Sequence, residues 1–226
     1  MPIRGILFDL DGTLVDRQTS LDVFANELAT TYADDLHDID TEDFLNIIRK
    51  ADGKGYRPKE AVFQDVIQQL PWITPPTVED LSDFWYTTYP KCAQPMKDAY
   101  DVLETLKTRG FKLGLITNGT ERSQMGKIER LDLHAYFETI VISETAGIKK
   151  PDPEIFKMAL NDLNLKASEA YYVGDHPTND IAGAETIGIT GIWLSGHLPW
   201  PQNTPAPKHP INRLVQLLHL IDKEDT

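Results

Sequence analysis

The sequence predicts an α/β protein whose parallel sheet is interrupted, near its start, by an all-helical block. Three apolar residues in a row, at positions 6–8, are typical of a short buried strand. From about residue 17 to about residue 94, the apolar residues follow only helical spacing. From about residue 98 onward, helical patterns alternate with short apolar runs, which is typical of parallel βαβ units. The 226 residues are enough for a core plus an insert.

Two carboxylates stand at the exit of the first predicted strand. In extended backbone, Asp9 and Asp11 point to the same side and can face one site. Gly12 permits the sharp turn that follows them. Two like charges this close repel, so the fold must neutralise one of them or hold a cation between them. Mg²⁺ suits carboxylate oxygens, although an ordinary Asp-Gly turn would also explain these residues.

Four helices are expected in the block between residues 17 and 94, because apolar residues recur there at three- and four-residue steps. The residues expected to cap or begin these helices are Thr19 or Ser20, Thr41, Pro58 and Thr77. A polar break at residues 53–58, which contains two glycines, separates the second helix from the third. No strand pattern occurs in this block.

The rest of the chain is expected to alternate helices with strands. The further strands expected are 112–117, 139–143, 170–174 and 190–194. The helices expected around them are one that ends at Gly110, then 121–131, 151–164, 177–186 and a last one carrying Leu214 to Ile221. The segment 196–210 holds five prolines and is expected to be a loop.

Composition excludes several classes of partner. The formal net charge of −13 at pH 7 would repel nucleic-acid backbones, and no basic stripe interrupts it. Cys92 is the single cysteine, so no internal disulfide can form and nothing requires an oxidising compartment. The chain starts without a signal-peptide pattern, and no apolar run is long enough to cross a membrane. We therefore expect a cytoplasmic monomer or homodimer with neither nucleic-acid nor membrane partners.

Polar side chains follow four of the predicted strands, and the carboxyl ends of parallel strands meet at one edge of a sheet. These side chains are Asp9 and Asp11, Thr117 and Asn118, Lys149 and Lys150, and Asp175 with Asp180. Each pair alone has an ordinary explanation as a turn, a solvated lysine pair or a helix-start acid. Together they suit phosphoryl transfer, which needs a carboxylate nucleophile, a metal, groups that hold the phosphoryl charge and an acid–base residue.

Four motifs in this order resemble the haloacid dehalogenase (HAD) superfamily, in its phosphatase branch. They are Asp9-Leu10-Asp11-Gly12-Thr13-Leu14, Thr117-Asn118-Gly119, Lys150-Pro151-Asp152-Pro153, and Gly174-Asp175 with Asn179-Asp180. The resemblance implies a Rossmann-like parallel-sheet core formed by residues 1–16 and 95–226. It also implies an all-helical cap domain inserted at residues 17–94.

The resemblance assigns catalytic roles to the first three motifs. Asp9 would be the nucleophile and a Mg²⁺ ligand. Asp11 would be the general acid/base and would give its backbone carbonyl to the metal. Thr117 and Lys150 would hold the phosphoryl group, and Asn118 would share in binding the substrate.

The fourth motif completes the metal site that the resemblance implies. Asp175 would be an acidic ligand, and Asp180 would support the metal directly or through water. Lys150 is preferred over Lys149 as the phosphoryl-binding lysine, because it directly precedes the proline of its motif. His176 departs from the family pattern, in which a small residue is common here, and we expect it to be an exposed loop histidine.

The function implied is a Mg²⁺-dependent phosphatase that hydrolyses a small phosphorylated metabolite through an aspartyl-phosphate intermediate. Asp11 argues against dehalogenase chemistry, which needs no acid for the leaving group. Two alternatives remain open: a phosphomutase of the same superfamily, and a non-catalytic phospho-aspartate switch or binding protein. The inserted helical block favours the hydrolase over a switch, since phospho-aspartate receivers are smaller and uncapped.

Within the polar break, residues 53–57 are the candidate for substrate recognition in the cap. In capped relatives, a loop between cap helices reaches over the active site. Lys54 and Arg57 could therefore bind the leaving group of the substrate. A solvated turn whose charges do nothing explains the same residues equally well.

Overall fold

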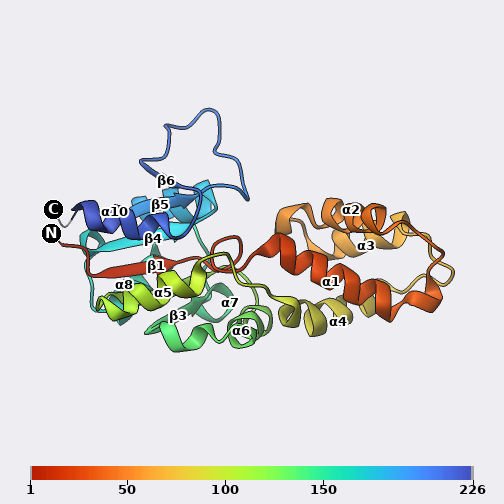
Figure 1. Ribbon diagram of the computed structural model, residues 1–226. Helices are drawn as coiled ribbons and strands as arrows, with labels where there is room; N and C mark the ends of the chain where they lie inside the picture. Colours follow the sequence, from red (N-terminus) through yellow and green to blue (C-terminus); the bar gives the residue numbers. More distant parts are fainter. Residues whose placement is uncertain (1, 225–226) are drawn as a thin grey trace. The chain divides into compact units, whose positions relative to one another are not determined.

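The apolar run that opens the chain forms strand β1, Gly5–Phe8, inside a six-stranded parallel sheet (Figure 1). The computed structural model describes residues 2–224. The chain divides into two units, one made of Met1–Asp16 and Pro95–Thr226 and the other of Arg17–Gln94. The strands of the first unit are β1, β2 (Lys112–Thr117), β3 (Thr139–Ile142), β4 (Ala170–Gly174), β5 (Thr190–Leu194) and β6 (His209–Ile211). The predicted α/β class is confirmed.

The order of the strands places β1 between β2 and β4, within the sequence β3-β2-β1-β4-β5-β6. Phe8, the last residue of β1, lies opposite Leu115 of β2 and Val173 of β4. All four residues of β1 are buried, as expected for a parallel strand that is covered on both faces. Whatever follows β1 is therefore flanked by the carboxyl ends of two other strands.

Helices cover both faces of the sheet. They are α5 (Ala99–Thr108), α6 (Glu121–Arg130), α7 (Ser143–Ala146), α8 (Pro153–Asp162), α9 (Gly183–Glu185) and α10 (Gln216–Glu224). Helix α8 packs on the sheet through Ile155 and Phe156, which share a core cluster with Leu7 and Tyr172. Figure 1 shows α5 and α10 crossing in front of the strands. Among the described residues, no helix is both long and apolar enough to cross a membrane.

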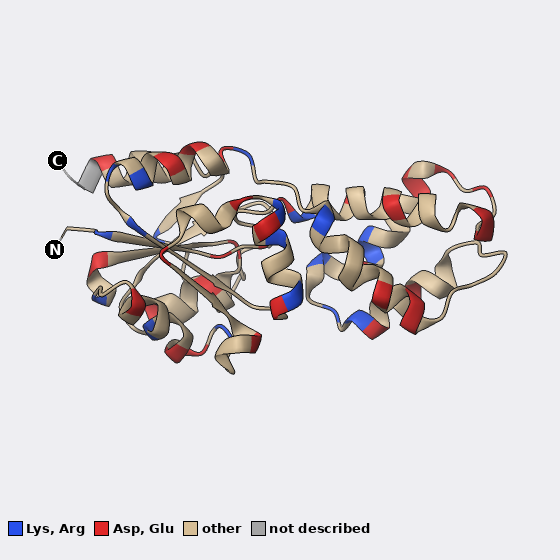
Figure 2. Ribbon diagram, turned by 90° about the horizontal axis from the view of Figure 1, so that it is seen from below, with Lys and Arg blue, Asp and Glu red and all other residues tan. Residues whose placement is uncertain are grey.

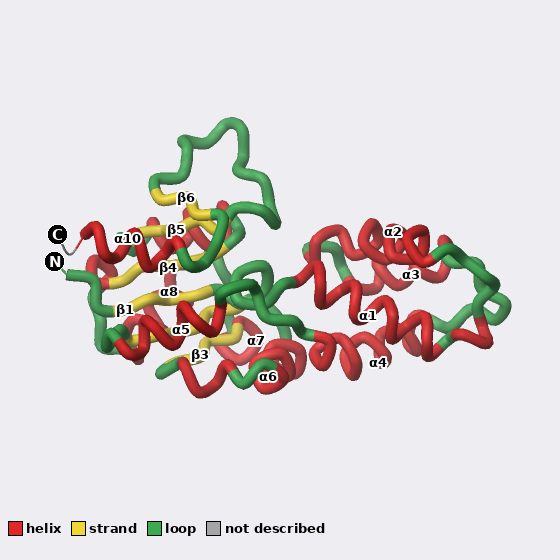
Figure 3. Tube along the Cα trace, viewed as in Figure 1, coloured by secondary structure: helices red, strands yellow, loops and turns green. Residues whose placement is uncertain are grey.

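The second unit contains helices and loops but no strand among its described residues, as Figure 3 shows. Its main helices are α1 (Arg17–Thr31), α2 (Thr41–Asp52), α3 (Lys59–Gln69) and α4 (Val78–Thr88). Aromatic side chains fill its core, where the Trp85 ring stacks on Tyr89 with centroids 4.2 Å apart. Phe24 meets Trp85 edge-on at 4.7 Å.

Charge is unevenly distributed over this helical unit. Figure 2 shows that acidic residues gather at the end formed by the loop between α1 and α2. Near the start of the unit, Arg17 and Lys59 both pair with the buried Asp52, at 2.7 and 2.9 Å. The end of the unit where the chain enters it is consequently the richer in lysine and arginine (Figure 2).

One expectation about the start of a helix is corrected. Thr19 and Ser20 do not cap α1, because the helix already begins at Arg17. The Ser20 hydroxyl instead accepts a hydrogen bond from the Gln94 backbone N–H at 2.9 Å. It therefore ties the beginning of the helical unit to its end.

Three local differences concern the sheet unit. Ser143 begins the short helix α7 rather than ending β3. The expected helix at 177–186 starts as a π-helical turn over Pro177–Ala182. The proline-rich segment ends in the sixth strand, β6, at the edge of the sheet, where Pro210 lies opposite Trp193. An edge strand tolerates proline because only one of its sides is paired.

Thr77→Ala should destabilise the helical unit. The Thr77 hydroxyl accepts a hydrogen bond from Asp80 N at 3.1 Å, and the Asp80 carboxylate accepts one from Thr77 N at 2.9 Å. This is a reciprocal capping box at the start of α4, and losing such a cap costs about 1 kcal/mol. Urea unfolding measures the change. Thr77→Ser keeps the hydroxyl and should match the wild type; an equal loss in both variants would contradict the capping role.

Candidate active site

The first unit brings seven of the predicted site residues to one edge of its sheet: Asp9, Asp11, Thr117, Asn118, Lys150, Asp175 and Asp180. Asp9 directly follows β1, Thr117 ends β2, and Asp175 directly follows β4. Lys150 comes from the loop between α7 and α8. The site is thus assembled where parallel strands end, which is where open α/β sheets bind ligands.

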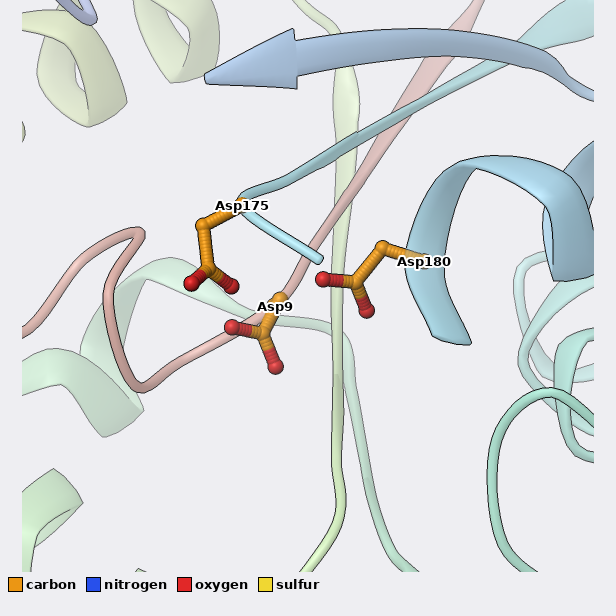
Figure 4. A group of neighbouring side chains, drawn as sticks. All are labelled: Asp9, Asp175 and Asp180. Carbon is orange, nitrogen blue, oxygen red and sulfur yellow. The ribbon is translucent and has the colours of Figure 1, made fainter. Parts of the chain in front are cut away.

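Three carboxylates converge at this edge. Asp9, Asp175 and Asp180 each offer an oxygen atom, and these oxygens all lie within 4.8 Å of one another. Figure 4 shows the three carboxyl groups turned toward a common point. Asp9 is 6% exposed, and Asp175 and Asp180 are each 1% exposed. Both oxygens of Asp175 are buried and accept no hydrogen bond from any described residue.

Burial and the repulsion of neighbouring carboxylates disturb the ionisation of Asp9 and Asp175. Burial, with Asp9 and Asp180 close by, raises the pKa of Asp175 to about 9. Burial raises the pKa of Asp9 to about 7 despite the adjacent ammonium of Lys150. When ionised, the three carboxylates carry two more charges than one lysine can balance. The residues therefore fit a divalent cation, and an all-oxygen ligand set of this kind suits Mg²⁺.

Lys150 is the cation at the centre of the site. Its Nζ lies 2.6 Å from Asp9 Oδ1 and 2.7 Å from Asp180 Oδ1. It also lies 2.8 Å from the Tyr172 hydroxyl and 2.9 Å from the Ile116 carbonyl. Burial alone lowers the pKa of Lys150, but the two carboxylates outweigh it and raise the pKa. Lys150 is therefore a permanently charged group.

Asn118 holds the backbone of Lys150. Its Nδ2 donates to the Lys150 carbonyl at 3.0 Å, and its Oδ1 accepts from Lys150 N at 2.9 Å. Both ends of the amide are thus engaged with one residue. In this arrangement Asn118 positions Lys150. The neighbouring lysine, Lys149, which was not the preferred candidate, is exposed.

The carboxylate of Asp11 is held by residues that the sequence analysis missed. Lys127 Nζ lies 2.6 and 2.8 Å from its two oxygens. Gln124 Nε2 donates to Asp11 Oδ2 at 3.0 Å and to the hydroxyl of Thr117. A signal was present: Gln124, Lys127 and Ile128 follow the spacing of a buried helical stripe, and two polar residues at such positions are unusual. Tyr172 gave no signal, because an aromatic residue in a buried strand is ordinary.

His176 is not the exposed loop histidine that was expected. It is half-buried, and its Nδ1 accepts hydrogen bonds from Thr178 N at 3.1 Å and Asn179 N at 3.2 Å. Its backbone N–H donates to Asp180 Oδ2 at 2.9 Å. Burial lowers the pKa of His176. The residue caps the π-helical turn and fixes the carboxylate of Asp180.

Lys54 and Arg57 belong to the helical unit. Arg57 Nη1 donates to the Ala51 carbonyl at 2.7 Å and pairs with Asp65 Oδ2 at 2.6 Å. Lys54 is exposed and has a positive φ of 60°, between Gly53 and Gly55, which also have positive φ. Arg57 is therefore committed to the local structure of the unit, whereas Lys54 stands on the surface of a left-handed turn.

The sequence model of the haloacid dehalogenase-like hydrolases matches residues 6–194. The glyceraldehyde 3-phosphate phosphatase of Methanocaldococcus jannaschii is 31% identical over 224 residues, covering 97% of each chain. The enzyme of that name from Pyrococcus furiosus is 30% identical over 233 residues, covering 99% of this chain and 95% of its own. Among solved structures, the magnesium-bound HAD-hydrolase YfnB from Bacillus subtilis has a TM-score of 0.76 at 21% identity, covering 98% of this chain and 100% of its own.

These similarities agree with one another. The family match spans all four motifs, both phosphatases are similar along nearly the whole chain, and the solved structure shares the fold. The predictions of an HAD-like fold and of an enzyme, an HAD-like phosphatase, are confirmed. The chain belongs to the haloacid dehalogenase-like hydrolase family.

Proposed function

We propose that the protein is a Mg²⁺-dependent phosphatase that hydrolyses a small phosphorylated metabolite through an aspartyl-phosphate at Asp9. The observation that carries the proposal is the buried carboxylate of Asp175, which accepts no hydrogen bond from the described residues and lies beside Asp9 and Asp180. A buried polar group without a partner is costly. A divalent cation bound by these carboxylates would remove that cost.

The metal would be held by Asp9, Asp175 and the backbone carbonyl of Asp11, with Asp180 binding directly or through water. When bound, Mg²⁺ offsets the repulsion between a carboxylate nucleophile and a phosphate group. The protein itself supplies a cation beside the nucleophile, Lys150, whose ammonium lies 2.6 Å from Asp9.

The reaction proceeds in two steps. A carboxylate oxygen of Asp9 attacks phosphorus while the bond from phosphorus to the leaving oxygen breaks. Asp11 donates a proton to that oxygen, so the product departs as an alcohol. Water then attacks phosphorus, gives a proton back to Asp11 and releases inorganic phosphate from Asp9. Lys150 and Thr117 hold the phosphoryl oxygens, whose charge is redistributed in both transition states.

The proposed substrate is a small phosphate monoester. Two similar proteins carry the name glyceraldehyde 3-phosphate phosphatase, so glyceraldehyde 3-phosphate is the first compound to test. A panel of other sugar phosphates, phosphoglycolate and nucleoside monophosphates tests the rest of the class. A cytoplasmic location and a monomeric or homodimeric state remain part of the proposal.

Asp9→Asn should reduce turnover by several orders of magnitude, because the amide is a poor nucleophile of nearly the same shape. The measurement is release of inorganic phosphate from the best substrate of the panel and from p-nitrophenyl phosphate. Asp101→Asn, an exposed acid on α5, is the matched control and should retain full activity. Repeated phosphate release by the wild type supports a phosphatase. A phosphorylated product would indicate a mutase, and a single stoichiometric uptake would indicate a switch.

Removal of metal should abolish activity and make stability fall as pH rises. Asp175 has an ordinary pKa of 3.8, which the fold raises to about 9. A raised pKa in the folded state means that folding favours the protonated form. This contribution is therefore complete below pH 3.8 and is lost as the pH climbs toward 9.

Thermal unfolding in EDTA across this pH range measures the effect. Asp175→Asn cannot ionise and should show a flatter dependence on pH than the wild type. Addition of Mg²⁺ should raise the melting temperature of the wild type most at the alkaline end. Identical pH slopes for the two proteins, or full activity in EDTA, would count against the metal site.

Lys54→Ala should raise KM for the preferred metabolite more than for p-nitrophenyl phosphate, because the second substrate offers the helical unit little to bind. We propose Lys54 as a substrate-binding residue because it is exposed on a left-handed turn. Arg57→Ala should instead lower stability, since its guanidinium holds Ala51 and Asp65. Lys50→Ala, an exposed lysine of α2, is the control. Equal effects of Lys54→Ala on both substrates would show that Lys54 does not determine substrate specificity.

A further inference from the structure

Two side chains from α6 form a closed network with Asp11 and Thr117. Lys127 Nζ lies 2.6 and 2.8 Å from the two oxygens of Asp11. Gln124 Nε2 donates to Asp11 Oδ2 at 3.0 Å and to the Thr117 hydroxyl. Lys127 also donates to Gln124 Oε1 at 2.8 Å. The two α6 residues are linked to each other, and through Gln124 to both residues of the site.

The members of this network differ in how much of each side chain is exposed to solvent. Gln124 is 2% exposed and Lys127 is 3% exposed, whereas the side chain of Asp11 is 22% exposed. A buried ammonium is costly unless a carboxylate pairs with it in good geometry. Lys127 and Gln124 are thus enclosed behind Asp11, and only Asp11 has a substantial surface open to solvent.

The backbone at the start of α6 is shaped to admit the Gln124 amide. Gly119 has φ +156°, and a Cβ placed on it would lie 2.8 Å from Gln124 Cδ. Thr120 follows and caps the helix by accepting from Ser123 N at 3.4 Å. The close approach of Gln124 to the end of β2 therefore depends on a glycine at this position.

We propose that Lys127 and Gln124 are positioning residues of the hydrolytic reaction: they fix the Asp11 carboxylate and the Thr117 hydroxyl relative to each other before substrate binds. This inference rests on the proposed phosphatase function. Asp11 donates a proton to the leaving oxygen as its bond to phosphorus breaks, and later accepts one from the attacking water. Both transfers require the carboxyl group to lie in line with the reacting oxygen, and small misplacements of such groups are expensive.

Lys127→Met removes the charge and the donors while keeping the length of the side chain. It should lower kcat for an alkyl phosphate about 10- to 100-fold and leave KM near the wild-type value, because Lys127 is buried behind Asp11. Gln124→Met should act in the same direction. Lys127→Arg keeps a cationic donor and should recover part of the lost rate. The matched control is Lys112→Met, at the opposite end of β2, where Nζ donates to the Leu163 carbonyl at 2.6 Å; it should leave kcat unchanged.

A double-mutant cycle with Asp11→Asn decides whether Lys127 acts through Asp11. Positioning predicts that Lys127→Met causes little further loss in the Asp11→Asn protein, since the group it positions is already disabled. An equal fold-loss in both backgrounds, or a wild-type kcat in Lys127→Met and Gln124→Met, would overturn the inference. Thermal unfolding of each variant shows whether it is folded. If Lys127→Met does not fold, Lys127→Arg is used in the cycle in its place. A wild-type protein that hydrolyses no phosphate monoester would overturn the proposed function itself, and the inference with it.

Discussion

The buried charge at the carboxyl end of β1 is the constraint on which the rest of the sheet unit depends. Ionised groups taken out of water cost several kcal/mol each unless other groups compensate them. Asp9 and Asp180 are compensated by Lys150, at 2.6 and 2.7 Å. Lys150 is in turn held by the Tyr172 hydroxyl and a backbone carbonyl of β2. Asp175 has no such partner among the described residues, and the proposed metal would compensate it.

The irregular turn after β4 follows from the same constraint. Asp180 must return to the strand end from which the chain has just departed, and the segment between forms a π-helical turn, Pro177–Ala182. A Cβ on Gly174 would lie 2.5 Å from the Asp180 side chain, so only glycine allows this approach. His176 stabilises the turn in two ways. Its ring nitrogen Nδ1 accepts hydrogen bonds from two backbone N–H groups, and its own backbone N–H donates to the Asp180 carboxylate. Such π-turns occur often at functional sites.

The parts of the fold that the sequence predicted are those governed by local pattern. Continuous apolar runs located five of the six strands. The motif residues directly follow several of these runs, so they were expected at strand ends. They were expected to meet because the carboxyl ends of parallel strands lie at one edge of the sheet. The sixth strand, His209–Ile211, was missed because it is short and contains a proline. The π-turn was missed because an ordinary helical pattern covers it. The contact of Tyr172 with the site could not be predicted from the sequence, since only the fold shows that its hydroxyl lies beside Lys150 Nζ.

Exposure increases across the site in the order in which the groups must meet solvent. Asp175 and Asp180 are 1% exposed and Lys150 is 3% exposed. Asp9 follows at 6%, and the side chain of Asp11 reaches 22%. Burial strengthens the interactions between a fixed charge and its partners, because the local dielectric is low. A group that exchanges protons with a leaving oxygen and with water needs access to both, so the gradient matches the separate duties proposed for Asp9 and Asp11.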